Sequence, residues 1–355
     1  MRRGSARTVT VAAGVAITLA MTALPAAATP DEGDTGASPS AVIGTGSLGE
    51  RQGAFLGRAA TAPDGRAATD AAAAEDIREY WTPERMRAAT PARRPGPERG
   101  AGTGTTGTGA VTPTGKPMRT EPVPPSAEAI AEAARAAGAS VTPAAAASAQ
   151  AGKVFYIDPI DGREHFCSGA TVASTKGRLV ATAGHCVHNG LWMLGWIFAP
   201  GYDNGAPYGT WIAGNLAART DWIYYARTAA DVGVAIMSGP PIVSVVGGNG
   251  LAWNQPIGPP VTVVAYPGAI NTQATCVGAT FTGIEPGHIG MAPCRFAPGG
   301  SGGPMLLNYG ALGSGRGYLN SVASHIYTNI PNDLYGPYFE DLNAGLFYYA
   351  EGLSP

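Results

Sequence analysis

The chain has 355 residues, of which 45% are hydrophobic and 14% charged, and its formal net charge at pH 7 is −2. Residues 151–355 carry 8 Lys and Arg against 11 Asp and Glu. They contain no basic cluster that could bind a phosphate backbone, which argues against nucleic acid as a partner.

The first 28 residues have the three parts of a secretory signal peptide. A basic start contains Arg3 and Arg7, an apolar stretch runs from Val9 to Leu24, and small residues end at Ala28. The apolar stretch is shorter than the roughly 20 residues that a membrane span needs, and no other uninterrupted stretch reaches that length. We therefore expect residues 1–28 to be a cleaved signal peptide, and the mature protein to be secreted, extracellular and free of membrane.

Residues 29–150 differ in composition from the rest of the chain. They are rich in Ala, Gly, Pro and Thr, and only Phe55, Tyr80 and Trp81 of the chain's 28 aromatic residues lie before residue 151. A segment of this kind buries little apolar surface, so we expect it to be largely disordered.

Two helices are predicted in this segment, from about Asp70 to Met86 and from Ser126 to Ala137, with Ser126 as an N-cap. Residues 101–109 read as a Gly/Thr linker. We interpret residues 29–150 as a propeptide and linker, released by cleavage near Gln150 to Val154. The alternative is a stalk that stays attached.

From residue 151 onward, short apolar runs alternate with Gly, Pro and Asn turns, and aromatic residues become frequent. Many short strands of this kind predict an all-β sandwich or barrel. A terminal helix is expected from Asp341 to Glu351. The predicted strands are Val154–Ile157, Phe166–Ala173, Leu179–Ala183, Trp192–Ala199, Val232–Met237, Val261–Tyr266, Pro304–Leu307 and Tyr318–Ser324.

The most informative motif is Pro298-Gly-Gly-Ser-Gly-Gly-Pro304, in which Ser301 is framed by four glycines. Glycine permits positive φ and close approach of the backbone, so such a loop can expose a serine and direct N–H groups at a ligand. A nucleophile with an oxyanion hole requires this arrangement. A flexible Gly/Ser turn is the other interpretation of the loop alone.

Two motifs upstream favour the catalytic interpretation. An apolar run ends in Thr-Ala-Gly-His185-Cys, and Asp231 precedes another apolar run, so the chain order is His, Asp, Ser. These motifs resemble the chymotrypsin/trypsin-like serine protease family over about residues 151–355. The chain has 3 Lys against 20 Arg. This bias is consistent with a secreted bacterial member of the actinobacterial type.

The resemblance implies two six-stranded antiparallel β-barrels and a C-terminal helix. His185 and Asp231 would lie on the first barrel and Ser301 on the second. Ser301 would be the nucleophile, His185 the general base, and Asp231 the group that orients the imidazole. The backbone N–H groups of Gly299 and Ser301 would form the oxyanion hole. The implied activity is that of a serine endopeptidase on protein and peptide substrates, as a monomer without cofactor.

Other residues of the same types compete for these roles. Asp203 and Asp221 are alternatives to Asp231, although neither precedes so clear an apolar run. The remaining histidines are expected to be structural, and they lack the spacing of a metal site; they are His165, His188, His288 and His325.

The four cysteines allow three disulfide connectivities in an oxidising compartment. The resemblance selects Cys167–Cys186, since a cysteine after the catalytic histidine bridges to a strand about 20 residues upstream. Cys276–Cys294 remains. No Cys-x-x-Cys spacing supports a zinc site, so we expect no metal.

Gly300 departs from the family pattern, because the residue before the nucleophile is usually Asp. In animal enzymes this Asp pairs with a newly cut N-terminal amine, which Gly300 cannot do. The departure leaves open how the oxyanion loop is ordered, with Pro298, Pro304 and a nearby disulfide as contributors. It also keeps a catalytically silent binding or scaffolding domain, and an esterase, as alternative functions.

The substrate pocket of the resembled fold (S1) is formed by segments before and after the nucleophile. Here those segments supply Arg295, Phe296, Ser324 and His325. A cation at Arg295, assisted by His325, would favour an acidic residue before the cleaved bond (P1). The alternative is an Arg295 that points to solvent, with Phe296 and Ala297 shaping a modest apolar pocket.

Overall fold

The computed structural model of the protein describes residues 54–68, 71–92, 115–136, 148–268, 270–296, 298–311 and 315–353. The predicted signal peptide (1–28) and the predicted linker (101–109) lie outside these residues. Among the helices that are described, none combines the length and apolar composition needed to cross a membrane.

The first half of the fold is a closed six-stranded antiparallel barrel. Its strand order is β10, β11, β6, β5, β4 and β9, and β9 pairs again with β10. Every residue of β4 and β6 is buried, which explains why these strands read as continuous apolar runs. The strands are β4 (Ala151–Asp158), β5 (Arg163–Val172), β6 (Leu179–Thr182), β9 (Leu194–Pro200), β10 (Trp211–Arg219) and β11 (Gly233–Met237).

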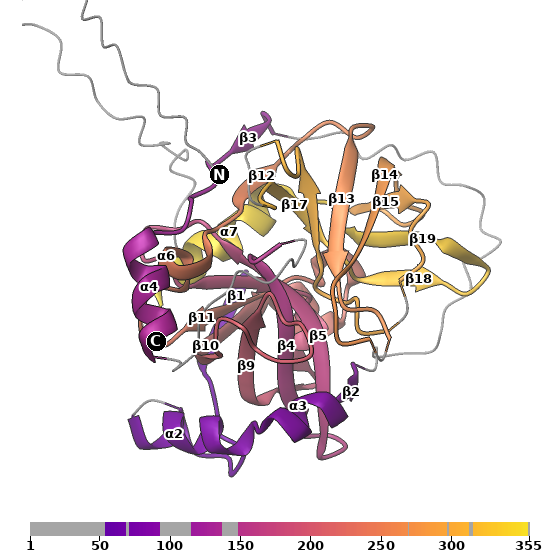
Figure 1. Cartoon of the computed structure of the whole chain (residues 1–355). Helices are drawn as coiled ribbons and strands as arrows, with labels where there is room; N and C mark the ends of the chain where they lie inside the picture. Colours follow the sequence, from indigo (N-terminus) through magenta and orange to yellow (C-terminus); the bar gives the residue numbers. More distant parts are fainter. Residues whose placement is uncertain are drawn as a thin grey trace, which may run out of the picture. The chain divides into compact units, whose positions relative to one another are not determined.

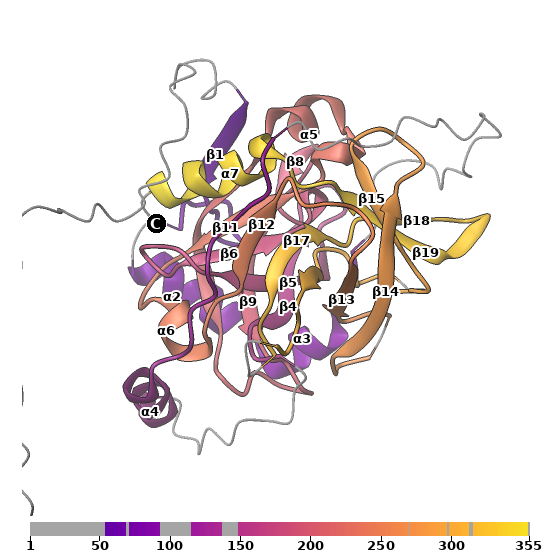
Figure 2. The ribbon, with the colours of Figure 1, turned by 90° about the horizontal axis from the view of Figure 1, so that it is seen from above.

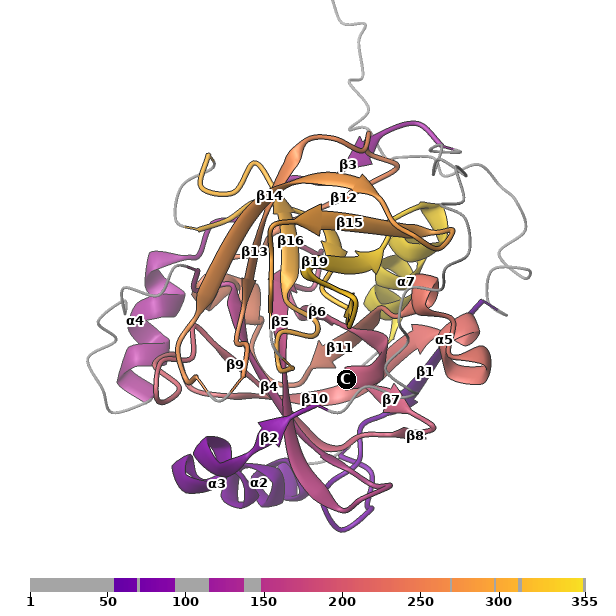
Figure 3. The same ribbon diagram turned by 90° about the vertical axis from the view of Figure 1, so that its right-hand side faces the viewer.

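The second half is a nine-stranded sheet with the order β18, β19, β15, β14, β13, β16, β17, β12 and β3. Figure 3 shows β13 to β16 above and the strands of the first barrel below. The mostly β architecture, with its closed barrel, second sheet and terminal helix, confirms the predicted chymotrypsin-like fold class. The strands are β3 (Met118–Arg119), β12 (Gly250–Trp253), β13 (Pro260–Ala265), β14 (Ala274–Thr282), β15 (His288–Ala292), β16 (Pro304–Leu307), β17 (Tyr318–Val322), β18 (His325–Tyr327) and β19 (Ile330–Pro337).

Short elements connect the strands. Helix α7 (Asp341–Gly352) lies beside β1 (Phe55–Ala59) (Figure 2). The N–H of Gly57 donates to the Tyr349 hydroxyl at 3.1 Å. The other connecting elements are the 3₁₀ turns η1 (Gly184–Cys186) and η2 (Thr228–Ala230), the hairpin β7 (His188–Asn189) and β8 (Leu191–Trp192), and helices α5 (Thr220–Tyr225) and α6 (Ile242–Val246).

Residues 54–92 are folded onto the first barrel, which corrects the expectation of disorder for this part of residues 29–150. Strand β1 pairs antiparallel with β10, and β2 (Thr90–Pro91) runs parallel to β5. Helices α2 (Ala71–Tyr80) and α3 (Pro83–Ala88) lie against the outside of the barrel (Figure 1). The segment has few apolar side chains, but Ile77, Trp81 and Met86 are all buried in the barrel's core cluster.

The single helix predicted from Asp70 to Met86 is two helices. The chain breaks at Trp81-Thr82 because Pro83 has no backbone N–H to continue the first helix. Pro83 instead starts α3, and the Thr82 hydroxyl caps it by accepting the N–H of Arg85 at 3.3 Å.

Residues 115–136 are also ordered. Strand β3 pairs with β12, and helix α4 (Ala127–Ala136) contacts α6. The predicted cap is present, because the Ser126 hydroxyl accepts the N–H of Ala129 at 3.4 Å. The predicted second helix is thus confirmed.

The compositional break at residue 151 does not coincide with a structural boundary. Ser148 and Gln150 are buried, and the Ser148 hydroxyl donates to the carbonyl of Gly315 at 2.9 Å. The expected cleavage region, Gln150 to Val154, enters β4, which pairs with a strand on each side. A protease would therefore reach these peptide bonds only after the barrel had opened.

Candidate active site

His185 and Asp231 are placed by two neighbouring strands of the first barrel. Strand β6 ends at Thr182 and leads into the turn that contains His185, while Asp231 lies just before β11. Thr182 pairs with Gly233 in the antiparallel register, so the end of β6 adjoins the start of β11. The apolar runs on either side of the motifs thus bring the two side chains together.

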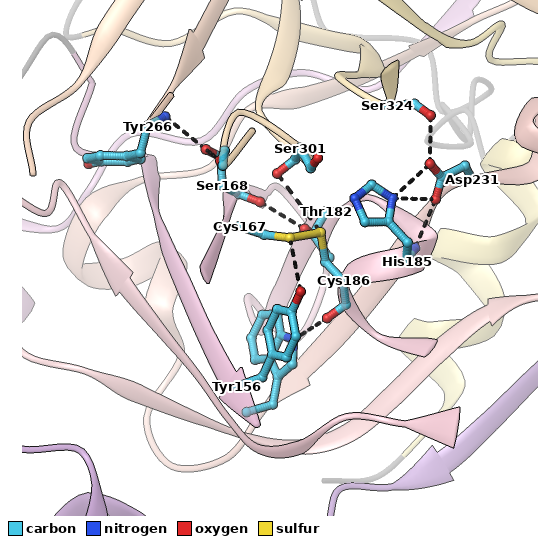
Figure 4. Close-up of a disulfide and its surroundings, with 12 residues drawn as sticks. Tyr156, Cys167, Ser168, Thr182, His185, Cys186, Asp231, Tyr266, Ser301 and Ser324 are labelled. Atoms are coloured by element: carbon cyan, nitrogen blue, oxygen red, sulfur yellow. Dashed lines mark hydrogen bonds and ion pairs between the residues drawn. A yellow bond between two sulfur atoms is a disulfide. The ribbon is translucent and has the colours of Figure 1, made fainter. Parts of the chain in front are cut away.

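Two hydrogen-bond donors of His185 engage the Asp231 carboxylate. The backbone N–H donates to Oδ1 at 2.9 Å, and ring Nδ1 lies 2.9 Å from Oδ2 and 3.1 Å from Oδ1 (Figure 4). An ionised carboxylate only accepts hydrogen bonds, so Nδ1 carries the proton. In the neutral imidazole Nε2 is therefore a lone-pair acceptor.

The Nε2 atom of His185 is buried and has no hydrogen-bond partner among the described residues. Figure 4 shows this nitrogen on the side of the ring that faces Ser301, with Asp231 on the opposite side. An acceptor held in this way can take a proton from a hydroxyl beside it.

Asp231 is held in the ionised form despite its burial. Burial alone raises the pKa of this carboxyl, but the charge and N–H groups of His185 and the hydroxyl of Ser324 outweigh it. The net result is a pKa well below the ordinary range. Ser324 donates to Oδ2 at 2.6 Å, so the carboxylate is bonded from two sides (Figure 4).

The loop around Ser301 requires glycine at two positions. Gly302 has φ +80°, and a Cβ there would lie 2.2 Å from the carbonyl oxygen of Ser168. Gly299 has φ +100°, and a Cβ there would lie 2.6 Å from the ring of Phe166. Positive φ together with these contacts excludes larger residues, so the glycine motif reflects close packing against the first barrel.

Both disulfides have the pairing that the resemblance implied. Cys167 on β5 bonds to Cys186 across 19 residues, and Cys276 on β14 bonds to Cys294 across 18 residues. The first bridge ties the turn that carries His185 to β5 (Figure 4). The second joins β14 to the segment that leads toward Ser301.

The competing acids are engaged elsewhere. Asp221 forms ion pairs with Arg219 at 3.1 Å and Arg227 at 3.3 Å. The backbone N–H of Asp203 donates within its own loop to Gly205. Neither acid has a described contact with His185.

The other histidines have structural partners. His165 contacts Asp161 at 3.1 Å, and His288 contacts the carbonyl of Glu285 at 3.1 Å. Burial lowers the pKa of His188 and of His288, which favours their neutral forms.

The predicted S1 residues are brought together only in part: the Ser324 hydroxyl lies 3.1 Å from Nδ1 of His325. Arg295 is exposed, whereas Phe296 is buried in the core of the second sheet. Ser324 bonds to Asp231, as described above. His325 is buried, and its ring stacks on Tyr335 with centroids 5.6 Å apart.

Two groups of residues have ligand atoms close enough to share a metal ion: Cys167, His185 and Cys186, and Asp158, Asp161 and His165. In the first group both sulfurs are in the disulfide and Nδ1 of His185 contacts Asp231. In the second group, the two ring nitrogens of His165 contact Asp161 and the Thr90 hydroxyl. The Nδ1 atom of His185 and both ring nitrogens of His165 thus already have hydrogen-bond partners.

One residue at the site went unnoticed in the sequence. Ser168, directly after Cys167, donates its hydroxyl to the carbonyl of Gly299 at 2.9 Å. Its position next to a cysteine is the only signal in the sequence, and a serine in a strand gives no hint of its partner.

Comparison with known proteins places the chain in a family. Neither models of protein families nor curated protein sequences gave a match. Solved structures did match. The protease Anisep from Arthrobacter nicotinovorans is 29% identical with a TM-score of 0.53, covering 58% of this chain and 97% of the other. The thermostable serine protease AL20 from an extremophilic microorganism is 30% identical with a TM-score of 0.53, covering 58% and 99%. With this similarity and the fold described above, the chain belongs to the chymotrypsin/trypsin-like serine protease family.

Proposed function

We propose that this protein is a secreted serine endopeptidase made as a preproprotein, with Ser301 as nucleophile, His185 as general base and Asp231 as orienting acid. The observation that carries the proposal is the buried Nε2 of His185, which lacks a described partner and faces Ser301 while Nδ1 is bonded to Asp231. This is the state a general base needs before it accepts a proton.

The reaction proceeds in two steps. Ser301 Oγ attacks the carbonyl carbon of the peptide as its proton passes to Nε2 of His185. The imidazolium then protonates the leaving amine, and an acyl-enzyme remains. A water molecule, deprotonated by the same nitrogen, attacks the acyl carbon. The bond from this carbon to Ser301 Oγ then breaks, His185 returns the proton to Oγ, and the new carboxylic acid is released.

The developing oxyanion would accept hydrogen bonds from the N–H groups of Gly299 and Ser301. Removing one such donor costs roughly 2.7–4 kcal/mol of transition-state stabilisation. Neither N–H donates a hydrogen bond to another described residue, which leaves both free for a substrate.

Hydrolysis of denatured casein by the secreted protein tests the activity, with Ser301→Ala as the matched control. We expect turnover by the wild type and a loss on the order of 10⁶-fold in the variant. Equal, negligible rates for both proteins would favour a silent binding domain. Turnover of esters without peptide cleavage would identify an esterase.

Residues 54–92 are proposed to stay with the folded enzyme after any processing. Ile77, Trp81 and Met86 are buried against the barrel, and β1 and β2 pair with its strands. A cut between residues 92 and 115 would leave this segment bound without a covalent link. Size-exclusion chromatography after such a cut should show one complex that separates in denaturant; two species in buffer alone would refute the proposal.

An acidic P1 residue remains our proposal for specificity, based on the charge of Arg295. Because Arg295 is exposed, water screens its charge and the discrimination should be modest. Cleavage of a peptide library should favour Glu and Asp. Equal or faster cleavage after Leu or Phe would instead support an apolar pocket that includes Phe296.

A further inference from the structure

The oxyanion loop is ordered although Gly300 provides no carboxylate. Four successive backbone carbonyls of the loop each accept a hydrogen bond. Gly268 N–H donates to Pro298 at 2.7 Å, the Ser168 hydroxyl to Gly299 at 2.9 Å, Gly303 N–H to Gly300 at 3.0 Å, and Ser168 N–H to Ser301 at 2.7 Å. The loop is thus fixed by neutral partners at every peptide unit from 298 to 301.

These bonds determine where the loop's N–H groups point. In a planar trans peptide the C=O and N–H are antiparallel, so a bonded carbonyl also sets the direction of the N–H across the same unit. The carbonyl of Pro298 therefore sets the N–H of Gly299, and the carbonyl of Gly300 sets that of Ser301. These are the two proposed oxyanion donors, and each points away from the partner of its carbonyl.

Ser168 makes or supports most of the hydrogen bonds that order this loop. It lies on β5 of the first barrel and is 1% exposed. Its hydroxyl donates to Gly299 and accepts the N–H of Tyr266 at 2.9 Å (Figure 4). Tyr266 leads two residues later to Gly268, whose N–H bonds to Pro298.

Ser168 therefore acts on both peptide units that flank Gly299. It bonds directly to the carbonyl of the Gly299–Gly300 unit. It also holds the segment that bonds to the Pro298–Gly299 unit. Only a side chain that donates and accepts at once can make both contacts, and a hydroxyl does so without charge.

We propose that Ser168 is the positioning residue for the oxyanion hole, and that it replaces the acid that Gly300 lacks. This proposal rests on the proposed endopeptidase function. An acid at position 300 would need a cationic partner, whereas the Ser168 hydroxyl needs none, so the anchor does not titrate. Without the hydroxyl, glycine at positive φ allows the Gly299–Gly300 peptide to rotate and the adjoining donor to leave its position.

Ser168→Ala removes both contacts of the hydroxyl, and Ser168→Thr keeps a hydroxyl. The matched control is Ser321→Ala, because Ser321 is also buried and donates its hydroxyl to the Pro337 carbonyl at 2.7 Å. Misplacing one donor should lower kcat of Ser168→Ala by about 10²-fold with little change in KM. Ser168→Thr should recover most of kcat, and Ser321→Ala should keep it. Wild-type kcat in Ser168→Ala, or an equal loss in Ser321→Ala, would overturn the proposal.

A structural comparison separates this proposal from the proposed function. Crystal structures of Ser301→Ala and of Ser301→Ala with Ser168→Ala require no activity. We expect the Gly299 carbonyl on the Ser168 hydroxyl in the first, and a rotated Gly299–Gly300 peptide in the second. An unrotated peptide in the double variant would overturn the role of Ser168, whereas a wild type that cleaves nothing would overturn only the function.

Discussion

Ser324 donates its hydroxyl to Oδ2 of Asp231 at 2.6 Å, the same oxygen that lies 2.9 Å from Nδ1 of His185 (Figure 4). The sequence suggested Ser324 as part of a substrate pocket. Its hydroxyl instead contacts Asp231, the proposed orienting acid, and lies 3.1 Å from Nδ1 of His325. These contacts favour the ionised form of the Asp231 carboxylate and restrain its orientation.

Replacing Ser324 by Ala should make the protein less stable at neutral pH. A hydrogen bond to an ionised group contributes about 1.5–3 kcal/mol. The pKa of Asp231 is lowered in the folded state. Its stabilising effect is therefore complete above the ordinary carboxyl pKa of about 4, and it is lost as the pH falls through the lowered folded value.

Urea unfolding of wild type and Ser324→Ala across acid and neutral pH checks this prediction. The stability difference should be largest near neutrality and shrink in acid, because the variant's Asp231 pKa returns toward its ordinary value. Ser321→Ala should show a difference that does not change with pH. A pH-independent difference for Ser324→Ala would contradict the account.

Lys153 should make stability rise with pH in the alkaline range. It is buried, with Nζ 3.8 Å from the ring centroid of Phe166 and 2.8 Å from Oδ1 of Asn271. Burial lowers its pKa to about 8. Between this value and the ordinary lysine pKa of about 10.4, the unfolded chain binds a proton that the folded chain does not, so the free energy of unfolding increases with pH.

Lys153→Met removes that titration and preserves a long apolar stem. From about pH 8 to pH 10, the wild type should gain stability relative to the variant, as measured by urea midpoints. The difference between the two proteins is used because tyrosine titration contributes equally to the pH dependence of both. Parallel pH profiles would show that Lys153 keeps its ordinary proton affinity.

The two disulfides should contribute similarly to stability but differently to activity. Their loops span 19 and 18 residues, so the chain-entropy model gives about 3 kcal/mol for each. Replacing Cys167 and Cys186 by Ala should also lower kcat/KM, because these residues adjoin Ser168 and His185. Replacing Cys276 and Cys294 should lower stability with a smaller effect on kcat/KM; the reverse order of activities would contradict this prediction.

Trp81 should be part of the folding core although it lies in the segment predicted to be a propeptide. Its indole is 4% exposed, contacts Phe155 and donates to the carbonyl of Gly195. Trp81→Ala should therefore cost about 3–5 kcal/mol. The exposed Tyr225 provides the control, since Tyr225→Ala should change the unfolding free energy by less than about 0.5 kcal/mol. Equal melting temperatures for wild type and Trp81→Ala would mean that the segment is dispensable.

The sequence predicted some buried strands closely but missed others, among them β10, β12 and β15. Runs such as Leu179–Ala183 and Val232–Met237 are apolar on both faces because both faces of these barrel strands are buried, and they match β6 and β11 closely. Strand β14 was not predicted, since small residues interrupt its apolar pattern and its exposed positions, Thr275, Val277 and Ala279, are not consistently polar. Strands are recognised in a sequence by their large apolar side chains. They are held together by backbone hydrogen bonds, which small residues form equally well.

The disorder that composition predicted for residues 54–92 was wrong for a related reason. Residues 71–88 are mostly Ala and charged residues, but Ile77, Trp81 and Met86 fall on the side that meets the barrel. A count of apolar residues does not reveal where they point. The same limit applies to Ser168 and Ser324, whose partners are 131 and 93 residues away in the chain.

The proposed mechanism makes Ser301 a nucleophile that His185 activates. Its most direct test is the intact mass and peptide map of the folded, disulfide-bonded protein after reaction with a fluorophosphonate. We expect one adduct on Ser301 in the wild type, none in Ser301→Ala, and a much slower reaction in His185→Ala. A wild-type protein that stays unlabelled, or that is labelled on another serine, would contradict the proposed mechanism.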